Sequence, residues 1–128
     1  MCGPKPLIDR ARRIRKMLGG GMRQVGLLAA AANHALDHHV ERLVDDHANA
    51  RRLADGLARI PGISVVAPDT NIVFANVEGG RTAALLAHPA SRGVLATGLI
   101  GLRFVTHLDV DAAGVDRAIA AVAEFMAA

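Results

Sequence analysis

Three consecutive glycines at positions 19–21 interrupt a basic, helix-like segment near the start of this chain. Glycine loses more backbone entropy on ordering than any other residue, so it is unfavourable inside helices and strands. The triplet therefore predicts a sharp corner between two helices. Cations flank the corner on both sides, which makes it a candidate place to hold an anion: Arg12, Arg13, Arg15 and Lys16 before it, and Arg23 after it.

The spacing of apolar residues predicts an α+β chain. Its 128 residues amount to one domain's worth of chain, enough to bury a core. We expect helices packed on a small, mainly antiparallel sheet, preceded by two N-terminal helices. The predicted helices cover residues 4–18, 22–38, 40–60, 82–87 and 111–125, and the predicted strands cover 63–67, 71–77, 94–96 and 102–106. Pro89 is expected to cut the fourth helix short.

Composition excludes several classes of partner. The net charge is +3. Many of the basic residues lie between positions 5 and 23, so the positive charge is confined to one part of the chain. Aromatic residues make up 2% of the chain, which leaves little to stack on bases, and no nucleic-acid partner is expected. The longest apolar stretch, residues 25–32, is too short to cross a bilayer. One cysteine and no apolar signal segment lead us to expect a cytoplasmic protein with no membrane partner.

Four sequence blocks, in order and spread over nearly the whole chain, resemble the low-specificity L-threonine aldolases. They are residues 15–24, 47–54, 70–74 and 102–109. The resemblance implies a fold-type I pyridoxal phosphate (PLP) enzyme that cleaves β-hydroxy-α-amino acids to glycine and an aldehyde. It further implies a small-molecule amino-acid substrate and a homo-oligomer. Residues 1–39 would be the end of the large domain, and residues 40–128 the C-terminal small domain.

The resemblance also implies that the cofactor's lysine is absent from this chain. In the family that lysine lies in a Ser-Lys-Gly segment, which would precede residue 1 here. Lys5 and Lys16 are the only lysines, and neither has that context. Because the protein must hold PLP covalently on a lysine, we expect no catalytic residue in this chain. We therefore expect it to be inactive alone and to use PLP only in the complete enzyme.

Two other functions remain open at this stage. The chain could be a non-catalytic interaction module that pairs with a full-length aldolase, or with itself, through the Ala-rich second helix. It could also be one half of a split PLP enzyme whose lysine lies on a separate polypeptide.

Three residues are candidates for the site that the resemblance implies. Arg23 would reach the PLP phosphate of the neighbouring subunit, and Lys16 would point toward the substrate's hydroxyl end in the partner's site. Arg103 would hold the substrate α-carboxylate, for which a guanidinium is suited. The alternative for Arg23 and Lys16 is a solvated surface cation, and for Arg103 an outward-facing strand residue.

Histidines form the remaining candidate group. His34 and His38 are four residues apart, a spacing that can place two metal ligands on one helix face. No HExxH motif or cysteine ligand accompanies them, so we interpret them as solvated or packed histidines and expect no metal site. His107 and Asp109 are expected to form a turn that caps the last helix. Between Gly79 and Gly101 the chain departs from the family pattern. This departure affects the packing near Arg103 and therefore the direction in which its side chain points.

Overall fold

The computed structural model describes residues 2–98 and 101–128. Met1 lies outside the described residues, as do Leu99 and Ile100 in the segment that departs from the family pattern. The chain divides into two compact units, Met1–Val40 and Glu41–Ala128. None of the described helices is long and apolar enough to cross a membrane.

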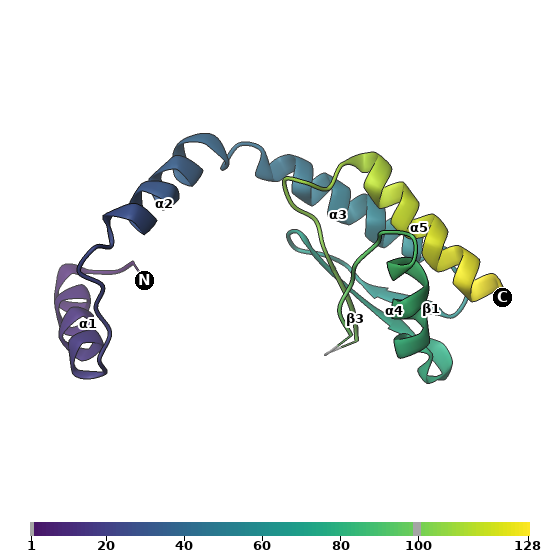
Figure 1. Cartoon of the computed structure of the whole chain (residues 1–128), viewed down its shortest axis with the longest axis horizontal. Coiled ribbons are helices and arrows are strands. Elements are labelled where there is room, and N and C mark those ends of the chain that lie inside the picture. The colour runs from purple at the N-terminus through teal and green to yellow at the C-terminus, as the bar shows by residue number, and fades with distance from the viewer. Residues whose placement is uncertain (1, 99–100) are drawn as a thin grey trace. The chain divides into compact units, whose positions relative to one another are not determined.

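The first unit consists of two helices, as predicted. Helix α1 covers Lys5–Met17 and α2 covers Gly26–His38 (Figure 1). Helix α2 begins four residues later than expected, because residues 23–25 form a turn. None of the described residues of either helix is buried. Large apolar side chains on α1 and at its C-terminal end are therefore exposed, with Leu7 51% exposed and Leu18 82% exposed.

The glycine corner is a helix C-cap of the Schellman type. The amide of Gly19 donates to Lys16 O at 3.1 Å and the amide of Gly20 donates to Arg15 O at 2.8 Å. Gly19 has φ +80°, the left-handed conformation that this motif requires and that glycine adopts without strain. A Cβ on Gly20 would lie 3.0 Å from Arg15 O. Two of the three glycines thus serve to end α1, and their amides are not free to bind an anion.

The second unit contains three α-helices and a three-stranded antiparallel sheet among its described residues, which confirms the α+β prediction. Its elements are α3 (Leu43–Leu57), β1 (Ile63–Val66), β2 (Ile72–Val77), the short 3₁₀ helix η1 (Glu78–Gly80), α4 (Thr82–Ala90), β3 (Leu102–Val105) and α5 (Ala112–Ala127). The strand order is β1-β2-β3, so β2 is central. Figure 1 shows α3 and α5 side by side over the sheet.

The core lies between the helices and one face of the sheet. Strand residues alternate, so that Val73, Ala75 and Phe104 point inward and are at most 4% exposed. They meet the buried stripes of α3 and α5, which include Leu53, Leu57, Val115 and Val122. Helix α5 begins at a side-chain cap, in which the Gly114 amide donates to Asp111 Oδ1 at 2.7 Å.

Two local predictions about residues 82–96 are wrong. Residues 94–96 do not form a strand, and the neighbouring Thr97 makes only a single bridge with Arg103. Helix α4 runs past Pro89 to Ala90. A proline one residue from the helix end removes only one hydrogen bond, so the helix closes normally, with the Arg92 amide donating to Pro89 O at 2.9 Å.

Candidate functional site

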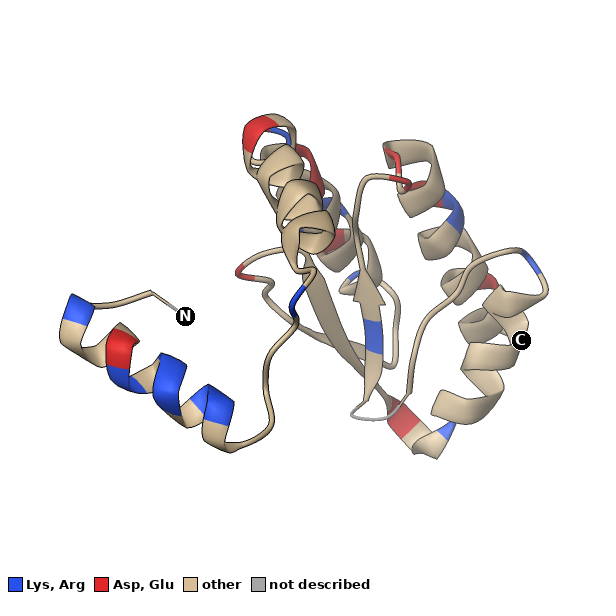
Figure 2. Ribbon diagram, turned by 60° about the vertical axis from the view of Figure 1, so that its left-hand side comes forward, with Lys and Arg blue, Asp and Glu red and all other residues tan. Residues whose placement is uncertain are grey.

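Lys16 and Arg23 lie on either side of the glycine corner in the first unit. Lys16 is in the last turn of α1, and its Nζ lies 3.3 Å from the point that a Cβ of Gly21 would occupy. Arg23 is exposed in the turn before α2. No side chain caps the first turn of α2, so its amides keep the donor capacity of a helix N-terminus. Figure 2 shows that basic residues recur along α1.

Arg103 lies in the middle of β3, on the opposite side of the sheet from the core. It pairs across the sheet with Phe74 of β2. On its other side it exchanges two backbone hydrogen bonds with Thr97, at 2.8 and 3.0 Å. Its backbone is therefore held from both sides. Among the described residues, no side chain accepts a hydrogen bond or forms an ion pair with the Arg103 guanidinium.

The face of the sheet around Arg103 is apolar and partly exposed. The strand register places Val66, Phe74 and Arg103 in one row across the three strands. Val66 is 60% exposed and Phe74 38% exposed, and Val105 on the same face is 37% exposed. Arg103 is half-buried on this apolar face, and its guanidinium, which has no partner among the described residues, is suited to donate two hydrogen bonds to a carboxylate.

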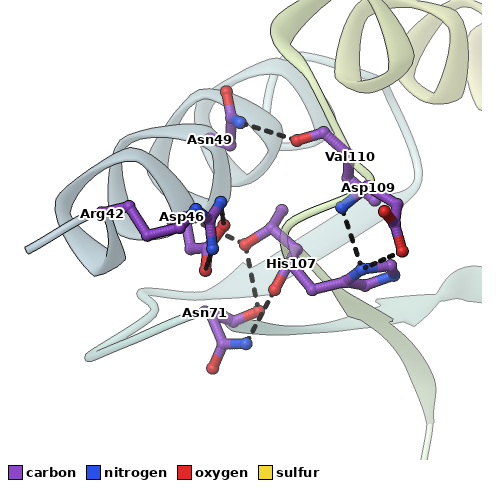
Figure 3. A network of polar contacts seen from close by, with 8 residues as sticks. Arg42, Asp46, Asn49, Asn71, His107, Asp109 and Val110 are labelled. Carbon is purple, nitrogen blue, oxygen red and sulfur yellow. Dashed lines mark hydrogen bonds and ion pairs between the residues drawn. The ribbon is translucent and has the colours of Figure 1, made fainter. Parts of the chain in front are cut away.

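A polar network joins the start of α3 to the ends of β2 and β3 (Figure 3). Asp46 is 3% exposed, and Arg42 donates to both of its carboxylate oxygens at 2.8 and 3.0 Å. These hydrogen bonds to Asp46, and the carboxylate charge, raise the pKa of Arg42 above its usual value. The hydroxyl of Thr106, 1% exposed, donates to Asp46 O at 2.7 Å. The network fixes where β3 ends and the following loop begins.

The same network continues through two asparagines. Both lie in the sequence blocks named above, but the sequence did not show what they do. Asn71 donates to Thr106 O at 2.7 Å, and Asn49 donates to Val110 O at 3.0 Å. His107 lies in the turn with Asp109, whose amide donates to His107 Nδ1 at 3.3 Å, but the residue that caps α5 is Asp111. The expectation that His107 and Asp109 cap the last helix is therefore wrong. No local signal in the sequence reveals this network, because Asp46 lies between polar residues and its burial depends on groups distant along the chain.

A pocket of about 190 Å³ lies between β3, the loop after α4 and the start of α5. Thr106, Asp111 and Arg117 contribute to its lining, but Arg103 does not. The described residues hold no group of three or more histidine, cysteine or acidic side chains that could bind a metal ion. The predicted residues are thus divided between the units, with Lys16 and Arg23 in Met1–Val40 and Arg103 in Glu41–Ala128.

Comparison with known proteins identifies one family over most of the chain. The family model described as beta-eliminating lyase matches residues 1–79. The low specificity L-threonine aldolase of Escherichia coli strain K12 is 46% identical over 110 residues, which cover 86% of this chain and 33% of that protein. A probable low-specificity L-threonine aldolase 2 of Arabidopsis thaliana is 51% identical over 77 residues, 59% of this chain and 22% of that protein.

More distant relatives include a protein that is named for a different activity. The alanine racemase TOXG of Cochliobolus carbonum is 32% identical over 127 residues, 91% of this chain and 32% of that protein. The chain spans about a third of the length of the first of these relatives. Since the family model covers more than half of the residues, and the residues it matches include the glycine corner, α3 and the first two strands, the chain belongs to the beta-eliminating lyase family.

Proposed function

We propose that this chain is the C-terminal part of an L-threonine aldolase-like, PLP-dependent lyase. In the complete enzyme the reaction would cleave β-hydroxy-α-amino acids to glycine and an aldehyde. The observation that carries the proposal is Arg103 on an exposed apolar sheet face, with no partner for its guanidinium among the described residues, in a chain 46% identical to an L-threonine aldolase over 110 residues. The lower identity to a racemase, 32%, favours the lyase reaction.

Arg103 would hold the substrate's α-carboxylate. Its guanidinium can donate two parallel hydrogen bonds to a carboxylate, and the surrounding Val66, Phe74 and Val105 would keep water from competing. The backbone bridge to Thr97 supports this role, because it holds the Arg103 main chain between two neighbours. A fixed main chain limits the orientations that the side chain can adopt.

The residues of the first unit fit the phosphate of PLP. Arg23 precedes a helix start that lacks a side-chain cap, and an anion at such a start gains both amide donors and the helix dipole. When bound, PLP supplies the electron sink for breaking the Cα–Cβ bond. Lys16 would stand near the hydroxyl end of the substrate and orient it. We expect Lys16 and Arg23 to act in the site of a neighbouring subunit.

The lysine that links covalently to PLP is the part that we propose this chain does not supply. Lys5 forms a 2.6 Å ion pair with Asp9, and Lys16 lies in the last turn of α1 and is not part of a Ser-Lys-Gly sequence. We therefore propose that the 128 residues alone do not catalyse the reaction.

A chimera tests this function. Residues 15–128 would replace the matching third of the Escherichia coli K12 L-threonine aldolase, and glycine release from L-threonine would be measured. We expect an active chimera. Arg103→Gln should lower kcat/KM about 10–100-fold, because a charged hydrogen bond contributes about 1.5–3 kcal/mol. Arg51→Gln, a matched change at an exposed arginine of α3, should leave kcat/KM unchanged.

The PLP absorbance of each chimera separates failure to fold from failure to catalyse. A chimera that binds PLP and releases no glycine would contradict the lyase assignment. Equal kcat/KM values for the Arg103→Gln and Arg51→Gln chimeras would contradict the role of Arg103 in carboxylate binding.

A further inference from the structure

The end of α2 carries three histidines that the proposed function does not use. The ring centroids of His34 and His38 are 4.4 Å apart, and the planes are inclined by 52°. His39, which caps the helix, has its ring centroid 5.5 Å from that of His34. His34 and His38 are exposed, and His39 is half-buried. Among the described residues, none of the three imidazoles forms a side-chain hydrogen bond or an ion pair.

The geometry of His34 and His38 suits a shared metal ion. Residues four apart lie on one face of a helix, and a helical pair of histidines at this spacing is a known zinc-binding arrangement. Each imidazole nitrogen must lie about 2.0–2.1 Å from a zinc ion, so the two rings must approach within a few ångströms of one another. The observed 4.4 Å separation already meets that condition.

We propose that His34 and His38 form a two-point chelate for a divalent first-row transition-metal ion. Imidazole is a ligand for Zn²⁺, Ni²⁺ and Cu²⁺, and affinity rises along the series to Cu²⁺. Water would fill the remaining coordination positions, because the described residues provide no third ligand. The inference stands apart from the lyase function and from PLP.

The consequence of such a chelate is local stabilisation of α2. None of the described residues of this helix is buried, so it lacks the packing that stabilises most protein helices. A short isolated helix is marginal in water. An ion that binds the pair only when the turn is helical shifts the equilibrium toward the helix by mass action.

The test uses the tag-free full chain with Cys2→Ser as the background, because an exposed thiol would compete as a ligand. NiCl₂ is titrated by isothermal calorimetry, and helicity is followed by circular dichroism. We expect one Ni²⁺ per chain and a rise in helicity. His34→Ala and His38→Ala should each weaken binding by more than about 10-fold, the lower bound for losing even an outer-shell partner.

His107→Ala is the matched control, since His107 is also exposed and lies 3.7 Å from the Asp109 carboxylate. We expect it to bind Ni²⁺ like the background protein. His34→Gln repeats the test with a polar side chain, and the metal-free spectra of all variants establish that the chain remains folded. The proposal is overturned if the background protein binds no Ni²⁺, if the His34 and His38 variants bind as well as it does, or if only the His107 variant loses binding.

Discussion

At the scale of single residues, the buried polar groups decide how the strands of the second unit end. Asp46 and Thr106 are almost fully buried, and each has hydrogen-bond partners. Burying a polar group without a partner is costly, whereas a satisfied one fixes a single arrangement. Thr106 donates its hydroxyl to α3, and its backbone amide donates to Asn71 O at 3.0 Å. One residue thereby ties a helix to two strands.

Replacing Thr106 tests the contribution of that hydroxyl. Thr106→Val keeps the shape but removes the hydrogen bond from the Thr106 hydroxyl to Asp46 O, so the free energy of unfolding should fall by about 1 kcal/mol. Urea denaturation followed by circular dichroism measures it, since the chain has no tryptophan or tyrosine to report by fluorescence. Thr70→Val, at an exposed loop position, is the control and should change stability little. Equal effects of the two changes would contradict a structural role for the Thr106 hydroxyl.

At the scale of elements, the packing of α3 on α5 depends on a position without a side chain. A Cβ on Gly56 would lie 2.3 Å from Ile119 Cδ1 and 2.8 Å from Ile119 Cγ1. Two atoms of one side chain are in the way, so a small movement of the tip does not relieve the clash. Glycine is unfavourable in a helix interior by about 1 kcal/mol relative to alanine. Glycine is nevertheless suited to position 56, because α3 and α5 approach each other closely there.

A double-mutant cycle measures this packing constraint. Gly56→Ala alone should lower the free energy of unfolding by about 1 kcal/mol. Overpacking against Ile119 destabilises the protein by about 1–3 kcal/mol, whereas the higher helix propensity of alanine stabilises it by about 1 kcal/mol. In an Ile119→Ala background the clash is gone, so the same change should stabilise the protein. The coupling between the two sites should be about 1–3 kcal/mol. Additive effects in chemical denaturation would show that Ile119 does not set the helix spacing.

At the scale of the whole molecule, the two units differ in what stabilises them. Every buried residue in the described part of the chain lies in Glu41–Ala128. The helices of Met1–Val40 instead expose large apolar side chains, with Met17 74% and Leu27 82% exposed. Exposed apolar surface of this kind favours association with another surface. We therefore propose that the first unit mediates self-association, which agrees with the homo-oligomer expected of the complete enzyme.

Separating the units tests both statements. A protein of residues 41–128 should unfold cooperatively on heating, because it keeps the whole described core. It should be a monomer by light scattering, whereas the full chain should have a larger mass per particle than one copy. A non-cooperative transition for residues 41–128 would contradict an independent core. A monomeric full chain at high concentration would contradict self-association through the first unit.

The sequence alone was sufficient for most of the elements, because their signals are local. Apolar periodicity located five helices, and short β-rich runs located all three described strands. The strand prediction for residues 94–96 is wrong. These apolar residues pair with no strand, and the only pairing next to them is the single bridge between Thr97 and Arg103 among the described residues. Propensity can suggest a strand, but only pairing across a sheet makes one. For the candidate site, the sequence identified Lys16, Arg23 and Arg103 as residue types without showing what surrounds them.

The family and the order of helices and strands can be read from the sequence, since both depend on residue identity and spacing along the chain. The folded arrangement is needed to show that Asp46 is buried and that Arg103 lies on an exposed apolar face. Each of these depends on groups brought together from distant positions, such as Thr106 with Asp46 and Arg103 with Phe74. Burial and pairing are properties of the folded arrangement, so no local pattern could specify them.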